Sequence, residues 1–277
     1  MKIIENQIFD EERALYGEDG VKLISCSFDG ARDGESALKE SKNIRAEACY
    51  FNLRYPFWHN ENVEVDKCGM SDKCRAPLWY SKNITVTESV MNGVKAVREC
   101  ENIRISNTVI NSVEFGWFNK GVEIYDSEAT GEYFMLRSSD IRISNLAFKG
   151  KYSFQYIENA TFENCQFFTK DAFWHAKNVT VKNSVVEGEY LGWYSEGLTL
   201  INCKILGTQP LCYCKDLTLV DCEMIGCDLS FERSEVQATL TAPIISIKNP
   251  LSGSIKAPEI GEIVDEISGG RCEITVG

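Results

Sequence analysis

The segment from Asp171 to Gly188 reads Asp-Ala-Phe-Trp-His-Ala-Lys-Asn-Val-Thr-Val-Lys-Asn-Ser-Val-Val-Glu-Gly, and the chain repeats it. Residues 154–165, Phe-Gln-Tyr-Ile-Glu-Asn-Ala-Thr-Phe-Glu-Asn-Cys, and 192–203, Gly-Trp-Tyr-Ser-Glu-Gly-Leu-Thr-Leu-Ile-Asn-Cys, are neighbouring copies. We call Asn178 and its equivalents the anchors, which are Gly20, Asn43, Asn62, Asn83, Asn102, Gly121, Asp140, Asn159, Asn178, Gly197, Asp216 and Glu235. Successive anchors are 19 residues apart except at two places, where insertions near Gly30–Gly34 and Ser71–Arg75 lengthen the interval to 23 and 21. Such a period is typical of a solenoid.

Each repeat carries the pattern of short strands. The first and third positions after the anchor are apolar and the second is polar, as in Val179, Thr180 and Val181, which predicts a strand with one buried face. The sixth position is small and the eighth is apolar, which predicts a second strand, and a third strand leads to the next anchor. Between the first two strands the fifth position marks a corner, because Asn and Asp tolerate left-handed backbone. This position holds Asn107, Asp126, Asn145, Asn164, Asn183, Asn202 and Asp221.

Three parallel strands per turn predict an all-β fold, a parallel β-helix of about twelve coils. The unbroken period favours one domain over residues 1–277. We expect residues 1–19 to form an N-terminal cap, with Met1–Arg13 covering the first coil, and residues 20–235 to form the regular coils. Residues 236–277 should form shorter coils and a C-terminal cap, or a small sheet that continues the stack.

Several motifs carry a resemblance to known proteins. The Asn-Val-Thr-Val-x-Asn-Ser rungs resemble right-handed parallel β-helices of the pectate-lyase-like superfamily. The motifs Gly-Glu-Ser-Ala-Leu-Lys-Glu-Ser at 34–41, Pro-Leu-Trp-Tyr at 77–80 and Gly-Trp-Tyr-Ser-Glu at 192–196 are similar to the bacterial domain-of-unknown-function family 3737. The resemblance implies the right-handed fold over nearly the whole chain, and it implies sugars as ligands by analogy with the superfamily. It assigns no reaction.

The composition excludes some classes of partner. A net charge of −12 argues against nucleic acid, which needs a basic surface, and against anionic membranes. No apolar run is long enough to span a bilayer, and the first residues do not read as a signal peptide. We therefore expect a cytoplasmic protein with no membrane partner. Since no glycine-rich phosphate loop or nucleophile elbow occurs, we expect no cofactor.

The twelve cysteines fit the repeat better than a metal site. Half of them occupy the sixth position after an anchor, where Ser or Thr stands in most other repeats, so they are expected to be small buried residues. Cys212-Tyr-Cys214 has no second pair at a metal-like spacing. We expect no metal site and, in a cytoplasm, reduced thiols.

The third strand of the repeat carries the aromatic residues. All five tryptophans stand four residues before an anchor, and both histidines stand three residues before one. Neighbouring strand residues point to opposite faces, and the column five residues before the anchor is the better core candidate. The tryptophans would then face outward, with the Tyr/His column beside them. In the alternative, the tryptophans pack inside against small residues such as Ser81 and Ala176.

We place the candidate site on this third-strand face. The residues expected to bind substrate are Trp58, Trp79, Trp117, Trp174, Trp193 and His59. The catalytic hypothesis rests on one row on four consecutive turns, Arg137, Tyr156, His175 and Tyr194. Arg could hold a carboxylate, and His or Tyr could move a proton. Asp171 lies about 13 Å from His175 along an extended strand, which is too far for the two residues to pair unless the strand bends. Gly192 should open a depression if its column reaches the surface, and close it if the column is internal.

Two classes of function follow, and the sequence leaves open whether the protein is an enzyme. In the first, the aromatic face binds carbohydrate, and the protein could modify a polysaccharide. In the second, the face is non-catalytic and binds a protein partner or a second copy of the chain. A recurring cluster of carboxylates, as glycoside hydrolysis needs, is not evident, and neither is a calcium cluster of the pectate-lyase type.

Overall fold

The protein is described by a computed structural model that covers residues 1–266 and 270–277. The described residues form strands, turns and bends and contain no helix, so none of them forms a helix that could cross a membrane. Two compact units, Met1–Ile141 and Arg142–Gly277, divide the chain.

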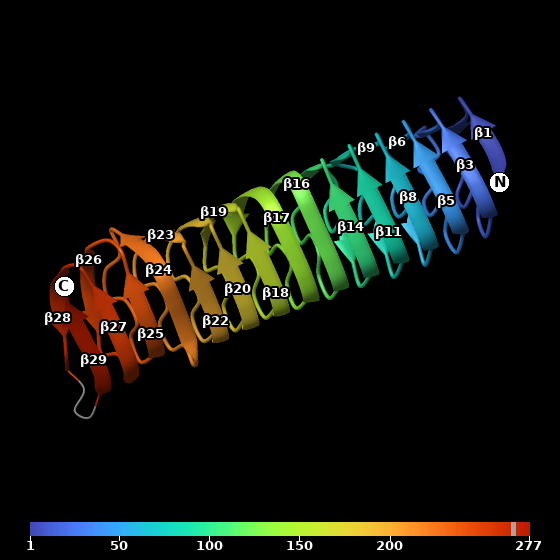
Figure 1. Cartoon of the computed structure of the whole chain (residues 1–277). Coiled ribbons are helices and arrows are strands. Elements are labelled where there is room, and N and C mark those ends of the chain that lie inside the picture. Colours follow the sequence, from blue (N-terminus) through green and yellow to red (C-terminus); the bar gives the residue numbers. More distant parts are fainter. Residues whose placement is uncertain (267–269) are drawn as a thin grey trace. The chain divides into compact units, whose positions relative to one another are not determined.

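Unit 1 is built from rungs of parallel strands (Figure 1). The first side of the coil carries β1 (Lys2–Glu5), β3 (Asp19–Ile24), β5 (Lys42–Glu47), β8 (Glu61–Asp66), β11 (Lys82–Thr87), β14 (Glu101–Ser106) and the first half of β16 (Lys120–Glu132). The second side carries β2 (Ile8–Phe9), β4 (Ser27–Phe28), β6 (Tyr50–Phe51), β9 (Gly69–Met70), β12 (Val90–Met91), β15 (Val109–Asn111) and the second half of β16. The third side carries β7 (Phe57–Trp58), β10 (Leu78–Trp79) and β13 (Val97–Arg98).

Unit 2 repeats the first two sides. The first side carries β18 (Glu158–Glu163), β20 (Lys177–Lys182), β22 (Glu196–Ile201), β24 (Leu217–Ile225), β25 (Glu235–Leu240), β27 (Ser252–Ala257) and β29 (Arg271–Val276). The second side carries β19 (Gln166–Lys170), β21 (Val185–Glu187), β23 (Lys204–Leu206) and the end of β24. The strand β17 (Ser139–Lys151) contains the boundary between the units, and β26 (Ile244–Lys248) pairs with β28 (Ile260–Val264).

The expected parallel β-helix is therefore confirmed, with a repeat of about 19 residues and about fourteen turns rather than twelve. The additional turns lie at the two ends. Residues 2–9 pair with the next coil as β1 and β2, and β27 and β29 continue the first side.

The third side differs from the expectation of a strand in every turn. Between residues 152 and 216 the segment that precedes each anchor consists of turns and bends. Asp171, Phe173 and His175 all have positive φ, at 55°, 59° and 54°, so alternate residues are left-handed. A strand needs extended backbone throughout, and this alternation curls the segment instead.

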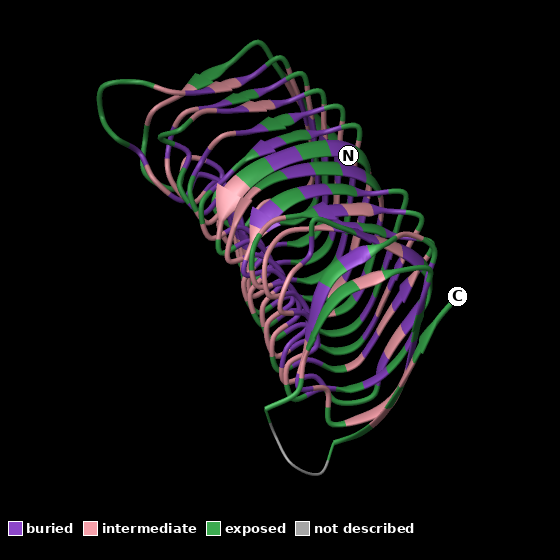
Figure 2. Ribbon diagram, turned by 90° about the vertical axis from the view of Figure 1, so that its left-hand side faces the viewer, coloured by how far each residue is buried: buried purple, intermediate pink, exposed green. Residues whose placement is uncertain are grey.

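The core follows the predicted alternation, which Figure 2 shows as alternating buried and exposed bands along the strands. Val179 pairs with Leu198, and both are buried, as is Leu217. The sixth position is an inner column of hydrogen bonds. There the backbone N–H of Cys68 donates to the Ser89 hydroxyl at 3.0 Å, and the N–H of Cys165 donates to that of Ser184 at the same distance. All twelve cysteines are unpaired, and eleven are buried.

The corner after the first side is left-handed, as predicted. Asn164, Asn183 and Asn202 have φ values of 54°, 49° and 50°, and Asn202 Nδ2 donates to Asn183 Oδ1 at 2.9 Å. A second asparagine ladder, which the sequence analysis did not predict, runs along the anchors of unit 1. The amides of Asn102, Asn83 and Asn62 each donate to the anchor one rung earlier, and the amide of Asn43 donates to Asp19, the residue before the anchor Gly20.

We expect the substitution Asn183→Leu to destabilise the protein. It removes the amide hydrogen bond to Asn202 and places a branched side chain in a left-handed conformation, and each effect costs about 1 kcal/mol. Urea denaturation measures the change. Glu196→Ala, an exposed position on β22, should leave the midpoint almost unchanged. An unchanged midpoint for Asn183→Leu would contradict a stabilising role for the ladder.

Candidate functional site

Two adjacent columns of the repeat face outward on the third side. Phe173 is fully buried, Trp174 and His175 are partly exposed, and Ala176 is buried again. Two neighbouring residues share one face because His175 is left-handed, which breaks the alternation of a strand. The outward interpretation of the tryptophans is confirmed by their partial exposure in all five cases. The column five residues before the anchor is the buried one.

In unit 2 the outer column is a stack of rings, which we call the tyrosine–histidine row: Tyr156, His175, Tyr194 and Tyr213. Neighbouring ring centroids lie 4.7, 5.0 and 4.9 Å apart with interplanar angles of 11°, 9° and 12°. Since the rings lie face to face, each inner ring has both faces covered. The ring edges are left to face solvent, and Tyr156 and Tyr194 are 41% and 46% exposed.

Two tryptophans of the adjacent column are held in fixed positions next to this row. Trp174 and Trp193 stack at 5.4 Å with an angle of 5°. Their indole N–H groups donate to the carbonyls of Tyr190 and Gln209 on the following coil, at 2.6 and 2.7 Å. Each indole is thus fixed by ring stacking and by a hydrogen bond, so the two tryptophan side chains next to the row are rigid.

In unit 1 the tryptophans share one column with two cations, and we call it the tryptophan column: Lys39, Trp58, Trp79, Arg98 and Trp117. Trp58 stacks on Trp79 at 5.7 Å. The Lys39 ammonium lies 4.3 Å from the centre of the Trp58 ring, and the Arg98 guanidinium lies 5.7 Å from Trp79 and 5.2 Å from Trp117. Cations on aromatic faces are attracted by the ring quadrupole, so these contacts hold the side chains of the column together. The indole N–H groups of Trp58 and Trp79 are buried and have no hydrogen-bond partner among the described residues.

The remaining predicted residues are placed as follows. His59 stacks on Tyr80 at 5.0 Å, in the outer column beside the tryptophan column. Arg137 is an exposed, left-handed residue of unit 1, whereas Tyr156, His175 and Tyr194 belong to unit 2. The structure therefore brings together three of the four residues of the catalytic hypothesis within one unit. Asp171 is buried, and its backbone carbonyl accepts a hydrogen bond from Gln155.

Two residues of the tyrosine–histidine row have shifted pKa values. Partial burial alone lowers the pKa of His175 below its ordinary value, with no contribution from a charged neighbour. Burial, and then the negative charge of Glu232, raises the pKa of Tyr213. His175 is therefore held neutral near pH 7, where an imidazole edge can both donate and accept a hydrogen bond.

The depression expected at Gly192 is absent from the described structure, and that expectation was conditional on a surface position. Gly192 is buried, and a β-carbon there would lie 2.9 Å from Leu211 Cδ2 and 3.1 Å from Leu198 Cδ2. At Gly116 the space that a β-carbon would take is likewise occupied, by the sulfur of Met135. Both glycines make room for core side chains of neighbouring coils rather than for a ligand.

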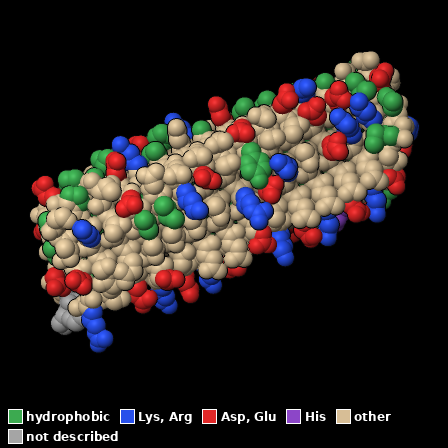
Figure 3. Space-filling model, in the orientation of Figure 1, with side chains coloured by type: hydrophobic (Ala, Val, Ile, Leu, Met, Phe, Trp, Pro, Cys, Tyr) green, Lys and Arg blue, Asp and Glu red, His purple; other side chains and the backbone are tan. Residues whose placement is uncertain are grey.

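No group of three or more His, Cys, Asp or Glu side chains within residues 1–266 and 270–277 is arranged to hold a metal ion. Acidic and basic side chains are interspersed over the face seen in Figure 3. Many of them pair between neighbouring coils, such as Lys82 with Glu101 at 3.2 Å and Lys204 with Glu223 at 3.8 Å.

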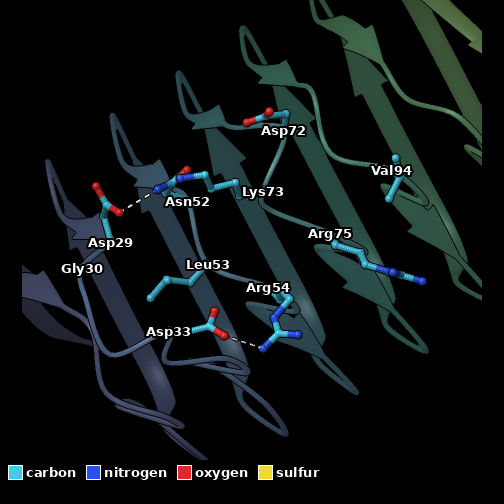
Figure 4. Close-up of a pocket in the computed structure, with 10 residues that line it drawn as sticks. All are labelled: Asp29, Gly30, Asp33, Asn52, Leu53, Arg54, Asp72, Lys73, Arg75 and Val94. Atoms are coloured by element: carbon cyan, nitrogen blue, oxygen red, sulfur yellow. Dashed lines mark hydrogen bonds and ion pairs between the residues drawn. The ribbon is translucent and has the colours of Figure 1, made fainter.

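A pocket that the sequence analysis did not identify lies in unit 1 (Figure 4). Its volume is about 480 Å³, and it is lined by Asp29, Gly30, Asp33, Asn52, Leu53, Arg54, Asp72, Lys73, Arg75 and Val94. The signal for it was present in the sequence, because most of these residues belong to the two insertions that lengthen the repeat or lie next to them.

Residues 2–275 match the family described as "Protein of unknown function (DUF3737)". The protein belongs to this family. No match was found among curated proteins.

Solved β-helix structures are similar to this family member at low identity. The mannuronan C-5 epimerase AlgE4 A-module of Azotobacter vinelandii has 12% identity, covers 98% of this chain and 88% of its own, and gives a TM-score of 0.31. PfbA, a surface adhesin of Streptococcus pneumoniae, has 12% identity, covers 87% of this chain and 74% of its own, and gives a TM-score of 0.36. The periplasmic alginate epimerase AlgG has 10% identity, covers 99% and 76%, and gives 0.28.

We expect Gly192→Ala to destabilise the protein more than Gly226→Ala. Both glycines are left-handed, with φ of +73° and +68°, so both substitutions carry the same backbone cost. At Gly192 the methyl group also meets Leu211 and Leu198, whereas at Gly226 nothing lies within 4 Å. Overpacking adds about 1 kcal/mol or more, which urea denaturation detects. Equal losses for the two variants would show that the space at Gly192 is not filled.

The lowered pKa of His175 predicts a pH-dependent stability. The unfolded chain takes up a proton at His175 near its ordinary pKa of 6.5, while the folded protein resists it. Stability contributed by the neutral imidazole is thus present above that pH and is lost as the pH falls through it. His175→Phe keeps the stack and removes the titration, so its melting temperature should drop less than that of the native protein between about pH 7.5 and about pH 5. Tyr156→Phe serves as the control, and an equal drop in all three proteins would contradict the prediction.

Proposed function

We propose that the protein binds an extended carbohydrate chain along its aromatic side. The observation that carries the proposal is the tyrosine–histidine row of unit 2. Phenol and imidazole edges follow one another at intervals of about 5 Å, which is the strand spacing of the coil and close to the length of one pyranose unit in an extended polysaccharide. Successive sugars could therefore meet equivalent polar groups.

The geometry supports hydrogen bonding to sugar hydroxyls more than stacking of sugars on rings. The ring faces of His175 and Tyr194 are each covered by a neighbouring ring on both sides. The side chains of His175 and Tyr194 make no hydrogen bond to any residue that the structure describes, so their polar atoms are available to a ligand. Since stacking fixes the rings beforehand, a ligand has little side-chain motion to arrest.

Catalysis remains a second hypothesis for the same row, with His175 or a tyrosine moving a proton. A binding surface is favoured because no charged neighbour shifts the pKa of His175, whereas catalytic bases commonly have a partner that orients them. If the row is catalytic, His175→Ala should abolish turnover of a polysaccharide and leave folding intact.

The non-carbohydrate alternatives are a protein partner or a homotypic interface at the same face. Analytical sedimentation at high concentration separates the homotypic interface from the other hypotheses, because a strictly monomeric protein would exclude it.

We also propose a cytoplasmic location, which the twelve unpaired cysteines support.

A glycan array and affinity electrophoresis against a polysaccharide panel test the proposal. We expect binding to at least one extended polysaccharide, and Tyr194→Ala should weaken it about tenfold, because two ring neighbours lose their support and one hydroxyl is lost. Phe168→Ala is the matched control, since Phe168 is a 45% exposed aromatic residue of β19 outside the row. Product analysis of the same mixtures reveals any turnover. Binding that survives Tyr194→Ala, or a panel with no binding at all, would rule out the row as a carbohydrate site.

A further inference from the structure

A column of charged residues runs beside the tyrosine–histidine row. Two residues after each ring of the row stands an exposed charged residue, and we call these four residues the charged flank: Glu158, Lys177, Glu196 and Lys215. Parallel pairing of β18, β20 and β22 sets Glu158 beside Lys177 and Lys177 beside Glu196, and a bridge joins Glu196 to Lys215. The sign of the charge therefore alternates from coil to coil, at the same spacing as the rings.

The alternation has a structural cause. At the same position in unit 1, Lys42 pairs with Glu61 and Lys82 pairs with Glu101, each at 3.2 Å. Opposite charges on adjacent strands attract, so the residues of this column compensate one another. The charged flank consequently offers a ligand no net charge, and a ligand with like charges along its length meets a like charge at every second coil.

The tyrosine–histidine row itself is uncharged near pH 7. A phenol has an ordinary pKa of about 10, and burial raises the pKa of Tyr213 further. Partial burial lowers the pKa of His175, so its imidazole is neutral as well. Neutral phenols and imidazoles both donate and accept hydrogen bonds, which matches the hydroxyl groups of sugars.

Arg233 stands at the end of the row. The N–H of Cys214 donates to the Ser234 hydroxyl at 2.9 Å, which aligns Ser234 with Cys214 and Arg233 with Tyr213. Arg233 is exposed, and its φ of 53° is close to the 61° of Tyr213. Its guanidinium could pair with one carboxylate at that end, but it cannot serve successive sugars along the row.

We propose that the tyrosine–histidine row takes an uncharged polysaccharide and rejects chains of uronic acids. The proposal rests on the carbohydrate function proposed above and narrows it to one class of ligand. A polyuronate carries a carboxylate on every sugar, so a chain lying along the row would bring carboxylates toward Glu158 and Glu196. The net charge of −12 adds a general repulsion. An uncharged chain meets neither penalty, and its hydroxyls can bond to the ring edges.

Affinity electrophoresis of the full chain tests the proposal. Gels that contain hydroxyethyl cellulose, galactomannan or arabinoxylan should retard the protein in at least one case. Polygalacturonate and alginate should bind at least about tenfold more weakly, because like charges meet at every second coil. Retardation by the uncharged polymer should be the same in about 0.05 M and about 0.5 M salt, since no ion pair contributes to it.

Different outcomes contradict this inference and the proposed function. Binding to polygalacturonate or alginate that equals or exceeds binding to every uncharged polymer would overturn the inference and leave the carbohydrate function standing. A loss of uncharged-polymer binding at high salt would overturn the inference as well. If no polymer retards the protein, the carbohydrate function fails, and the inference fails with it.

A double variant, Glu158→Gln with Glu196→Gln, tests the charged flank. It leaves Lys177 and Lys215 without neighbouring carboxylates, so polygalacturonate should bind about tenfold more tightly than it binds the native protein.

Glu64→Gln with Glu88→Gln is the matched control. It removes the same number of charges outside the third side of the coil, where Glu64 pairs with Arg45 at 3.6 Å and Glu88 pairs with Lys67 at 3.9 Å. An equal gain in both double variants would attribute the effect to net charge alone. No gain in Glu158→Gln with Glu196→Gln would show that the charged flank does not select the ligand, and either result overturns the assignment.

Discussion

Strict registry between coils is the constraint on which the structure depends. Parallel pairing sets each residue of a strand beside the residue at the same position of the next repeat, as Val179 beside Leu198 and Thr180 beside Thr199. The neighbours of a side chain, one strand spacing away, are therefore the residues that occupy the same position in the adjacent repeats. A residue type persists at a position only if it tolerates its own kind there, and amides, small hydroxyls, thiols and flat rings do. Like charges do not, which agrees with the alternation of sign in pairs such as Arg104 and Glu123.

The same constraint explains how the aromatic side differs from an open stacking surface. Flat rings placed one coil apart cover each other's faces, so the row built on His175 offers edges, hydroxyls and ring nitrogens to solvent. The left-handed backbone at this column does not by itself mark a functional site. Positive φ recurs at every corner of the coil, including Asn183 and Asn202, where its role is to turn the chain.

The sequence predicted the features that follow from the alternation of side chains, and it missed features that depend on backbone conformation or on contacts between distant residues. The strands of the first two sides, the left-handed corner at Asn183 and the inner position of Cys165 followed from periodicity, because each is set by local pattern and repeated many times. The third side was predicted as a strand in every turn, but alternation of apolar and polar residues cannot reveal that alternate residues such as Phe173 are left-handed. The pocket at Lys73 depends on two insertions meeting across coils, which is a tertiary effect. The position of Gly192 was likewise decided by Leu211, which lies 19 residues further along the chain.

The anchor ladder of unit 1 has a direction. Each amide from Asn102 to Asn43 donates toward the lower-numbered coil, so the carboxamide dipoles point the same way and add along the corner. Such a row is an electrical counterpart of the aligned peptide units of a helix, with its positive end at Asn43. Asp19 accepts the last hydrogen bond there and places a carboxylate at that positive end. This is the charge arrangement that stabilises a helix N-terminus, reproduced here with side chains alone.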